Sequence, residues 1–393
     1  MPNFYNPYDE AFRANPWPIY HRMRDEAPAY FVEELNTWAL SRFDDVLYGG
    51  MDRLHYTASV GTTMDALFYG APTPPMFMWM DPPKHTHHRV VVNPLYQKDA
   101  VSLLAEKIRS LTKRLLAPAL QTGELEIHTL ATQVGLYTIA DYIGLQHTQI
   151  AHIGALIERF FHREPGVIGP TPEGFAAFGA LREYILELLK ALRVTPPPPD
   201  THLHAWLTSE IDGHRMTDDE IFFSVFAMTV TGADTLALTC AGTVYYLNEH
   251  PDQYAEVRAD HGLIPHAFAE TGRFDQPTNV LGRRVVNDFE LHGEKIRTGQ
   301  NVLFLFASAN RDDREFVDAD QYQISRRPRR TMTFGAGIHA CLGQHLARLE
   351  GKIILEEVFA AIPEYEVQKT RCKRAFSEFL QGYAHVPISF KPR

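Results

Sequence analysis

Cysteine is scarce in this chain of 393 residues, and its scarcity limits what the protein can be. Only three cysteines occur, Cys240, Cys341 and Cys372, and no two of them form a C-x-x-C pair. A small, odd and widely spaced set argues against a disulfide framework and against a structural zinc site. It favours a reducing compartment, so we expect a cytoplasmic protein.

Excess positive charge and long apolar runs are also missing. Lys and Arg number 38 against 48 Asp and Glu, and the net charge of −10 argues against nucleic acid as a general partner. The N-terminus has neither a basic start nor an apolar run, which argues against a signal peptide. No stretch reads as apolar for long enough to span a bilayer, so we expect no membrane anchor.

Helical periodicity is present over most of the chain. The longest pattern begins at Thr217, before an acidic first turn, and runs to about Asn248. At roughly 1.5 Å per residue, such a helix is about 45–50 Å long and crosses a whole domain. Other helices are predicted over Trp17–Arg24, Asp44–Tyr48, Asp81 to before Pro94, Ala100–Leu116, Ile127–Leu145, Gln149–His162, Pro172–Leu192, Pro265–Arg273 and Cys341–Ala361. Strands are predicted over Ala29–Val32, Thr37–Leu40, Val285–Val286, Phe289–Leu291, Val302–Leu305, Tyr365–Val367 and Val386–Phe390. The fold class is therefore mainly α with minor β.

One cysteine follows a loop rich in glycine, in the stretch from Phe334 to Gly343. Gly335 and Gly337 permit backbone conformations that direct amide groups toward the sulfur of Cys341. The helix that follows directs its own N–H groups and the positive end of its dipole toward the same atom. Such a cysteine is expected to have a lowered pKa and to act as a thiolate ligand or a nucleophile. The simpler alternative is a buried structural cysteine.

A second unusual stretch, Thr231-Gly232-Ala233-Asp234-Thr235, lies in the middle of the longest helical pattern. These residues are poor helix formers, and a tolerated kink would explain them. A hydroxyl beside a carboxylate is also suited to proton delivery. From these five residues alone, the two interpretations are about equally good.

The pattern F-G-x-G-x-H-x-C-x-G at 334–343 resembles the haem-thiolate loop of the cytochrome P450 family. Asp81-Pro82-Pro83-x-His85, the G-x-D-T stretch, Glu270-x-x-Arg273 and Ala309-Asn310-Arg311-Asp312 extend the resemblance over nearly the whole chain. It implies one domain over residues 1–393 with the triangular-prism fold of that family. Haem would then lie between the long central helix and the helix after Cys341.

The resemblance also implies roles for individual residues. Cys341 would be the axial ligand of haem b, and its glycine loop would moderate electron donation by the sulfur. Asp234 and Thr235 would deliver protons to dioxygen, Gly232 would leave room for it, and a buried Glu270–Arg273 pair would lock the scaffold. The cofactor-binding set expected from the family is His85, Arg89, Gly232, Arg283, Phe334, Gly335, His339, Cys341 and Gly343. Of these, His85, Arg89, Arg283 and His339 would hold the haem propionates.

The implied activity is monooxygenation, as hydroxylation or oxidative demethylation. Electrons would come from NAD(P)H through a separate ferredoxin and reductase, because the chain ends roughly thirty residues after its last long helix, too soon for a fused redox domain. Two alternatives stay open: a peroxide-driven peroxygenase, which would not need Asp234 and Thr235, and a haem-binding sensor without catalysis.

The partner surfaces are the least specific part of the sequence. The basic run Arg326, Arg327, Arg329 and Arg330, extended by Lys113 and Arg114, would dock an acidic redox partner, although such a run is usually a solvated face. Candidate substrate contacts are mostly apolar and favour an apolar organic molecule. They are Met64, Leu67, Met76, Phe77, Met78, Ala227, Met228, Thr231, Asn279, Val280, Phe379 and Leu380.

Overall fold

The computed structural model describes residues 4–69, 73–162, 164, 170–211, 213–375, 377 and 379–392. The longer helices are α2 (Trp17–Glu26), α3 (Phe43–Met51), α5 (Lys84–Val92), α7 (Ala105–Thr122), α8 (Ile127–Ile143), α9 (His147–Phe161), α10 (Pro172–Val194), α12 (Asp218–Glu249), α13 (Pro251–Ala259), α14 (Ile264–Phe274) and α16 (Gln344–Ala361). Shorter ones are α1 (Glu10–Ala14), α4 (Met64–Tyr69), α6 (Lys98–Ser102), α11 (His202–Thr208) and α15 (Phe306–Ala309). The predicted mainly helical fold is confirmed.

Among the described residues, the largest sheet has five strands, in the order β1 (Ala29–Val32), β2 (Thr37–Leu40), β10 (Asn301–Leu305), β7 (Val280–Val285) and β3 (Tyr56–Thr57). β10 runs parallel to β2 and antiparallel to β7. The remaining strands form small sheets: β4 (Glu124–Glu126), β11 (Glu366–Val367) and β14 (Pro387–Ser389) in one, and three hairpins, β5 (Glu210–Ile211) with β6 (His214–Arg215), β8 (Phe289–Leu291) with β9 (Glu294–Ile296), and β12 (Lys373–Arg374) with β13 (Tyr383–His385).

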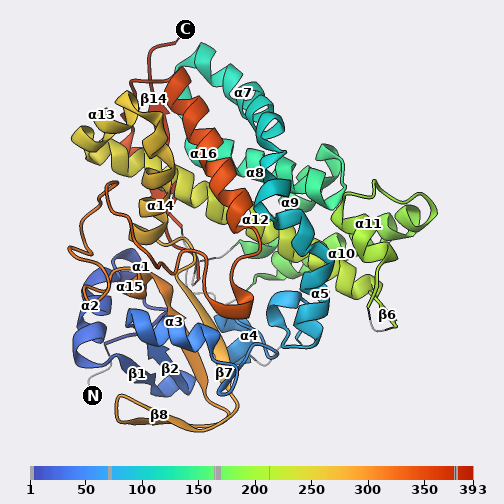
Figure 1. Cartoon of the computed structure of the whole chain (residues 1–393), viewed down its shortest axis with the longest axis vertical. Helices are drawn as coiled ribbons and strands as arrows, with labels where there is room; N and C mark the ends of the chain where they lie inside the picture. Colours follow the sequence, from blue (N-terminus) through green and yellow to red (C-terminus); the bar gives the residue numbers. More distant parts are fainter. Residues whose placement is uncertain are drawn as a thin grey trace.

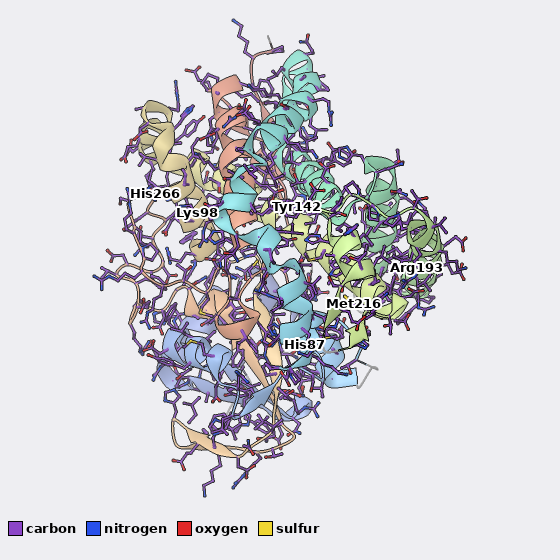
Figure 2. The ribbon with its side chains drawn as sticks, turned by 45° about the vertical axis from the view of Figure 1, so that its right-hand side comes forward. His87, Lys98, Tyr142, Arg193, Met216 and His266 are labelled. Atoms are coloured by element: carbon purple, nitrogen blue, oxygen red, sulfur yellow. The ribbon has the colours of Figure 1, made fainter. Side chains whose placement is uncertain are left out.

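The molecule has a helical part and a part built on the five-stranded sheet (Figure 1). The largest apolar core lies among the helices, where Figure 2 labels Tyr142 on α8. Two smaller cores cover the two faces of the sheet, and β10 serves both. Val302 and Phe304 face one core while Leu303 and Leu305 face the other, because successive strand residues point to opposite sides.

Helix α12 runs through the centre of the helical part (Figure 1). Thr217 caps it in a reciprocal capping box with Glu220, as its sequence predicts. Among the described residues, it is the one helix long and apolar enough to cross a membrane, so our expectation that no such stretch exists is wrong. Because 67% of its most apolar window is buried inside the fold, its apolarity is that of a core helix.

The chain between residues 57 and 75 contains α4 (Met64–Tyr69), and residues 70–72 fall outside the described residues. One other prediction needs correction. The last long helix does not begin at Cys341. It begins at Gln344 with Gly343 as its N-cap, so the cysteine belongs to the loop before the helix.

Candidate active site

The loop that carries Cys341 is closed on itself. The Cys341 N–H donates to the carbonyl of Phe334 at 2.8 Å, across the six residues between them. Gly335 and Gly337 have φ values of 66° and 69°, which favour glycine, and at Gly337 a Cβ would also lie 2.5 Å from the Gly50 carbonyl oxygen. The two glycines therefore let the loop fold back and pack against the end of α3.

The electrostatic surroundings of Cys341 are mixed. Its side chain is exposed by surface area, yet the protein around it desolvates the thiol and raises its pKa. The Gly343 N–H and the positive charges of Arg89 and Arg348 act in the opposite direction. The predicted lowering of the thiol pKa is therefore wrong for the protein alone. The groups expected to stabilise a thiolate are nevertheless in place, and a bound metal would complete their effect.

Arg89 and Arg348 fix this loop from two sides. The Arg89 guanidinium donates to the Ala340 carbonyl at 3.1 Å and to Asn93 Oδ1 at 3.2 Å. Arg348 lies over the ring of Phe334, 4.3 Å from its centroid. Each arginine thus adds positive charge near the sulfur while holding one end of the loop in position.

A stripe of threonines follows one face of α12, at positions 231, 235, 239 and 243. Each hydroxyl donates to the carbonyl four residues earlier, at 2.8 Å from Thr231 and Thr239, at 2.7 Å from Thr243, but at 3.3 Å from Thr235. Such bonds weaken the backbone ladder only slightly. The Thr235 bond is the longest of the four, so this hydroxyl is the one most easily turned toward another partner.

Asp234 points into a different environment from Thr235. It lines a cavity of about 230 Å³ with His128 of α8 and with Phe379 and Leu380 of the tail. Burial, and to a smaller extent the negative charge of Glu158 on α9, raises the pKa of the Asp234 carboxyl from 3.8 to about 6. Asp234 therefore binds and releases a proton near neutral pH, as an acid–base residue must.

Gly232 lies at a close contact between two helices. A Cβ at this position would lie 3.0 Å from Cγ1 of Ile139 on α8, and a Cβ at Gly135 would lie 2.9 Å from the Gly232 carbonyl oxygen. The missing side chains allow α8 and α12 to pack closely. The expected role of Gly232 in leaving room for dioxygen stays a prediction.

The four residues predicted to hold the haem propionates come together from two elements, α5 and β7, and from the cysteine loop. His85 and His339 have ring centroids 4.5 Å apart, and the positive charges of Arg89 and Arg283 act on both imidazoles. Arg283 is buried in β7 and donates to the Gly282 carbonyl at 2.8 Å. Three far-separated segments of the chain thus build one positive corner.

The present partners of this corner test whether it fits a haem. Across the part of the chain that the structure describes, no carboxylate lies within ion-pair distance of Arg89 or Arg283, and the buried His85 Nε2 has no hydrogen-bond partner. Burial lowers the pKa of Arg283 to about 10. Largely buried cations without an ion-pair partner, and a buried imidazole nitrogen without a hydrogen-bond partner, are costly for the protein alone. They suit the two carboxylates of haem.

The two histidines of this corner carry no positive charge in the protein alone. Burial and the neighbouring arginines lower the pKa of His85 to about 4 and that of His339 to about 3. Both imidazoles are thus neutral near pH 7. They offer hydrogen bonds, and the positive charge comes from the arginines.

Glu270 and Arg273 on α14 form the buried pair that the sequence suggests. Two Arg273 nitrogens donate to the Glu270 carboxylate at 2.7 and 2.9 Å, and both side chains are at most 1% exposed. Arg273 also donates to the carbonyls of Asn310, Ala319 and Gln321. The pair therefore ties α14 to the long loop that leads to Cys341.

Arg326 does not belong to an exposed basic cluster, which corrects part of the docking prediction. It is 9% exposed and donates to Glu270 at 3.2 Å and to the carbonyls of Val317 and Asp318. Arg330 is partly engaged by Glu315 and Asp44. The exposed members of the run are Arg327 and Arg329, together with Arg330.

The candidate substrate residues lie in several different environments. Phe379 and Leu380 line the cavity beside Asp234, and Thr231 is exposed in the middle of α12. Val280 is buried in the core under the sheet with Met64 and Leu67. Asn279 is engaged, since Tyr20 donates to its Oδ1 at 2.7 Å. Met76, Ala227 and Met228 are buried in the helical core, and Phe77 and Met78 pack against it.

Sequence reasoning missed three features of the site. His128 and Glu158 come from α8 and α9, more than seventy residues from Asp234, and no local pattern marks either. Arg348 could have been predicted from the sequence. It lies seven residues after Cys341, about two helical turns, so it falls on the side of the following helix that faces the cysteine. The third feature is Asp275, which accepts two hydrogen bonds from Arg374 at 2.7 and 2.8 Å and so anchors the tail hairpin.

Comparison with known proteins agrees with this geometry. Residues 175–374 match the model of the family described as Cytochrome P450. The chain is 36% identical to the Mycobacterium tuberculosis protein named cytochrome P450 123, covering 99% of this chain and 97% of that one. It is 28% identical to the Steroid C26-monooxygenase of Mycolicibacterium smegmatis, over 82% of this chain and 80% of that one.

Solved structures show the same fold. CalO2 superposes with a TM-score of 0.86 at 26% identity, covering 99% of both chains. CYP109E1 from Bacillus megaterium in complex with corticosterone superposes with a TM-score of 0.83 at 26% identity, covering 97% of this chain and all of that one.

Proposed function

The chain belongs to the cytochrome P450 family of haem-binding monooxygenases, and from this premise we propose that it inserts one oxygen atom into an apolar small organic molecule, by hydroxylation or oxidative demethylation. The observation that supports this most is the pairing of two features: Cys341 in its closed loop, and an aspartate with a raised pKa beside a loosely bonded threonine on α12. A single domain over residues 1–393 completes the proposal.

Cys341 is the residue that would bind haem iron, and bound haem supplies the redox chemistry that activates dioxygen. Arg89 and Arg283 supply positive charge for the two propionates, and His85 and His339 supply hydrogen bonds. Phe334, Gly335 and Gly343 shape the loop around the sulfur, and the Gly343 N–H moderates its charge. Gly232 contributes through helix packing.

Asp234 and Thr235 perform the proton chemistry of the site. Reduction of one oxygen atom to water consumes two protons. The Thr235 hydroxyl leaves its 3.3 Å bond to the Thr231 carbonyl and donates into the site. Asp234 then supplies the replacement proton, because about half of its carboxyl groups carry one near pH 6.

Electrons come from NAD(P)H through a separate ferredoxin and its reductase. Arg327 and Arg329 are the best remaining docking residues, since they are exposed and belong to a basic run on a chain of net charge −10. Lys113 pairs with Glu357 and contributes less, while Arg114 stays exposed. Such a system works in the cytoplasm, which agrees with the sparse cysteines.

The substrate is apolar and small. The cavity residues Phe161, Val230, Leu238, Phe379 and Leu380 present apolar surface with few polar groups, which is typical of a site for such a molecule. Relatives named for steroids support testing that class first. Thr231, exposed on the same helix, provides a hydroxyl for orientation.

The experiment is turnover under ¹⁸O₂. Compounds that convert the haem iron from low to high spin on binding are selected first and then incubated with NADPH, a surrogate ferredoxin and its reductase. We expect one ¹⁸O atom in the product and one in water. Product formed from hydrogen peroxide as fast as from the electron chain, and unaffected by Asp234→Asn, would favour a peroxygenase. Failure to consume oxygen with any partner, with ligand-dependent binding to another macromolecule, would favour a sensor.

A further inference from the structure

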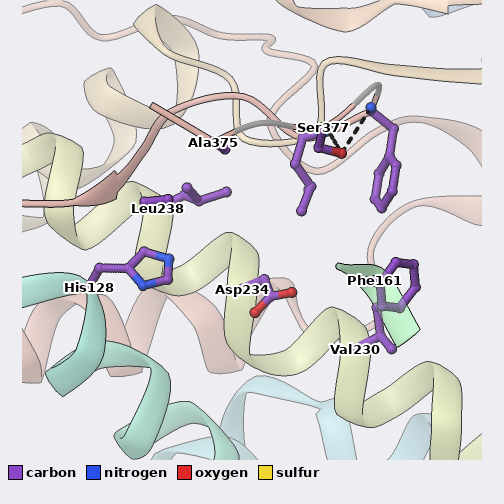
Figure 3. Close-up of a pocket in the computed structure, with 10 residues that line it drawn as sticks. His128, Phe161, Val230, Asp234, Leu238, Ala375 and Ser377 are labelled. Atoms are coloured by element: carbon purple, nitrogen blue, oxygen red, sulfur yellow. Dashed lines mark hydrogen bonds between the residues drawn. The ribbon is translucent and has the colours of Figure 1, made fainter. Parts of the chain in front are cut away.

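The cavity beside Asp234 joins two titratable groups that no family motif connects. The imidazole of His128 and the carboxylate of Asp234 both point into it, from α8 and α12 (Figure 3). Ser377 adds a hydroxyl from the tail, where its Oγ accepts from the N–H groups of Phe379 and Leu380. With about 230 Å³ and three polar side chains among mostly apolar ones, the cavity has room for a short chain of water molecules beside His128, Asp234 and Ser377.

On its other side, His128 faces a second set of titratable groups. Glu126 is the N-cap of α8 and accepts from the His128 backbone N–H at 3.3 Å. His385 Nδ1 on β13 lies 3.5 Å from Glu126 Oε1, and His385 is 36% exposed. The charges of both Glu126 and His385 act on the His128 imidazole. A series of proton-binding groups therefore extends from the surface at β13 to the cavity.

We propose that His128 is a proton-relay residue, which passes protons from the surface at His385 and Glu126 through the cavity to Asp234. The inference rests on the proposed monooxygenase function, in which Asp234 is the immediate proton donor. His128 lines the cavity together with the apolar side chains proposed as substrate contacts, and it acts on Asp234 through the water between the two side chains.

The relay moves protons only. His128 accepts a proton on one ring nitrogen and releases one from the other, and water carries it to the Asp234 carboxylate that has just lost its own. No electron moves, and each proton that enters the site is replaced by one from bulk solvent at His385. The Nδ1 of His128 lies 3.4 Å from Thr132 Oγ1, which holds the ring, while the described residues give Nε2 no hydrogen-bond partner.

The charges that face each group suit this direction of flow. Glu158 on α9 repels the ionised form of Asp234, so the carboxylate recovers a proton readily. Glu126 stabilises the positive charge that His128 carries briefly, while burial and His385 return it to the neutral form. Across the described residues, no strong ion pair holds His128 or Asp234 in one protonation state, as a relay requires.

The test compares His128→Gln with His21→Gln, a control at an exposed histidine of α2. Product formed per NADPH is measured against pH with a substrate found by spin shift. In His128→Gln we expect this yield to fall several-fold above about pH 6, where Asp234 is mostly ionised and depends on the relay, and to stay near wild type below it. The control should follow the wild type throughout. His385→Gln, at the exposed end, should change the yield in the same direction by less.

A second readout does not depend on turnover. In the holoenzyme held in its ferrous carbon monoxide form, the imidazole of His128 is titrated by NMR with and without Asp234→Asn. We expect its titration midpoint to move while that of His21 stays. An unchanged midpoint, together with an unchanged yield in His128→Gln, would overturn the relay. If Asp234→Asn still lowered the yield, the proposed monooxygenase function would stand without the His128 relay. If Asp234→Asn had no effect on the yield, the relay and the proton-delivery role of Asp234 would both fail.

Discussion

Two regions of this protein differ in whether their buried charges have partners of opposite charge. Around α14 they are matched: Glu270 with Arg273, and Asp275 with Arg374, each pair joined by two hydrogen bonds. Around the candidate active site they are unmatched: Asp234 faces the like charge of Glu158, and no carboxylate within ion-pair distance faces Arg283 across the described residues.

This difference separates scaffold from function. Breaking a matched buried pair is costly, because it leaves one buried charge without a partner. An unmatched buried charge lowers the free energy of unfolding until a ligand pairs with it or a proton neutralises it. Replacing charges in the two regions should therefore change the free energy of unfolding with opposite signs. Four predictions test that contrast, from the largest effect to the smallest.

Glu270→Gln should destabilise the protein most, by about 3–5 kcal/mol, because it strands Arg273 and Arg326. Chemical denaturation measures the loss. Asp219→Asn is the control, since it breaks the half-exposed pair with Arg182 and should cost less than about 1 kcal/mol. Equal losses in both variants would contradict a scaffold built on buried pairs.

Asp234→Asn should stabilise the protein while it impairs turnover. The folded-state pKa is raised from 3.8 to about 6, so the ionised carboxylate costs up to about 3 kcal/mol above pH 6 and nothing below about pH 4. The gain in the variant should therefore grow as pH rises from about 4 to 6 and then stay constant. Unfolding measured over that range checks it, and a gain independent of pH would refute the assignment.

Arg283→Met should weaken haem retention. The loss of one charged hydrogen bond of about 1.5–3 kcal/mol corresponds to haem release faster by roughly 10- to 100-fold. Transfer of haem to a scavenger protein measures the rate. Arg284→Met is the matched control on the same strand, because Arg284 donates to Asn301 Oδ1 instead. Equal rates for the two variants would remove Arg283 from the propionate set.

Arg329→Gln should change the free energy of unfolding by no more than about 0.5 kcal/mol, since the residue is exposed. It should slow reduction by a ferredoxin at low salt and have less effect at high salt. Arg326→Gln should do the reverse and destabilise the fold, because Arg326 binds Glu270. Slower reduction in Arg326→Gln at full stability would restore it to the docking surface.

The sequence predicted the features that depend on neighbours in the chain. The cysteine loop needs glycines at 335 and 337, and α12 needs its cap at Thr217, so short patterns revealed both. Features that depend on packing between distant segments were missed or assigned wrongly. Gly232 serves the contact with α8, Arg326 is buried by a loop that folds over it, and His128 meets Asp234 only in three dimensions.

The difference has a physical origin. Backbone conformation and helix capping are set within a few residues, whereas burial and partner choice are set by tertiary structure. The raised pKa of Cys341 shows this well, because the glycine loop and the helix start are present as expected while desolvation outweighs them.

The carbon monoxide difference spectrum of the reduced protein tests the central claim most directly, namely that Cys341 is the thiolate ligand of haem. Wild type and Cys372→Ser, a control at a half-buried cysteine far along the chain, should both give the thiolate-type spectrum. Cys341→Ser should lose it. A thiolate-type spectrum that persists in Cys341→Ser would contradict the account.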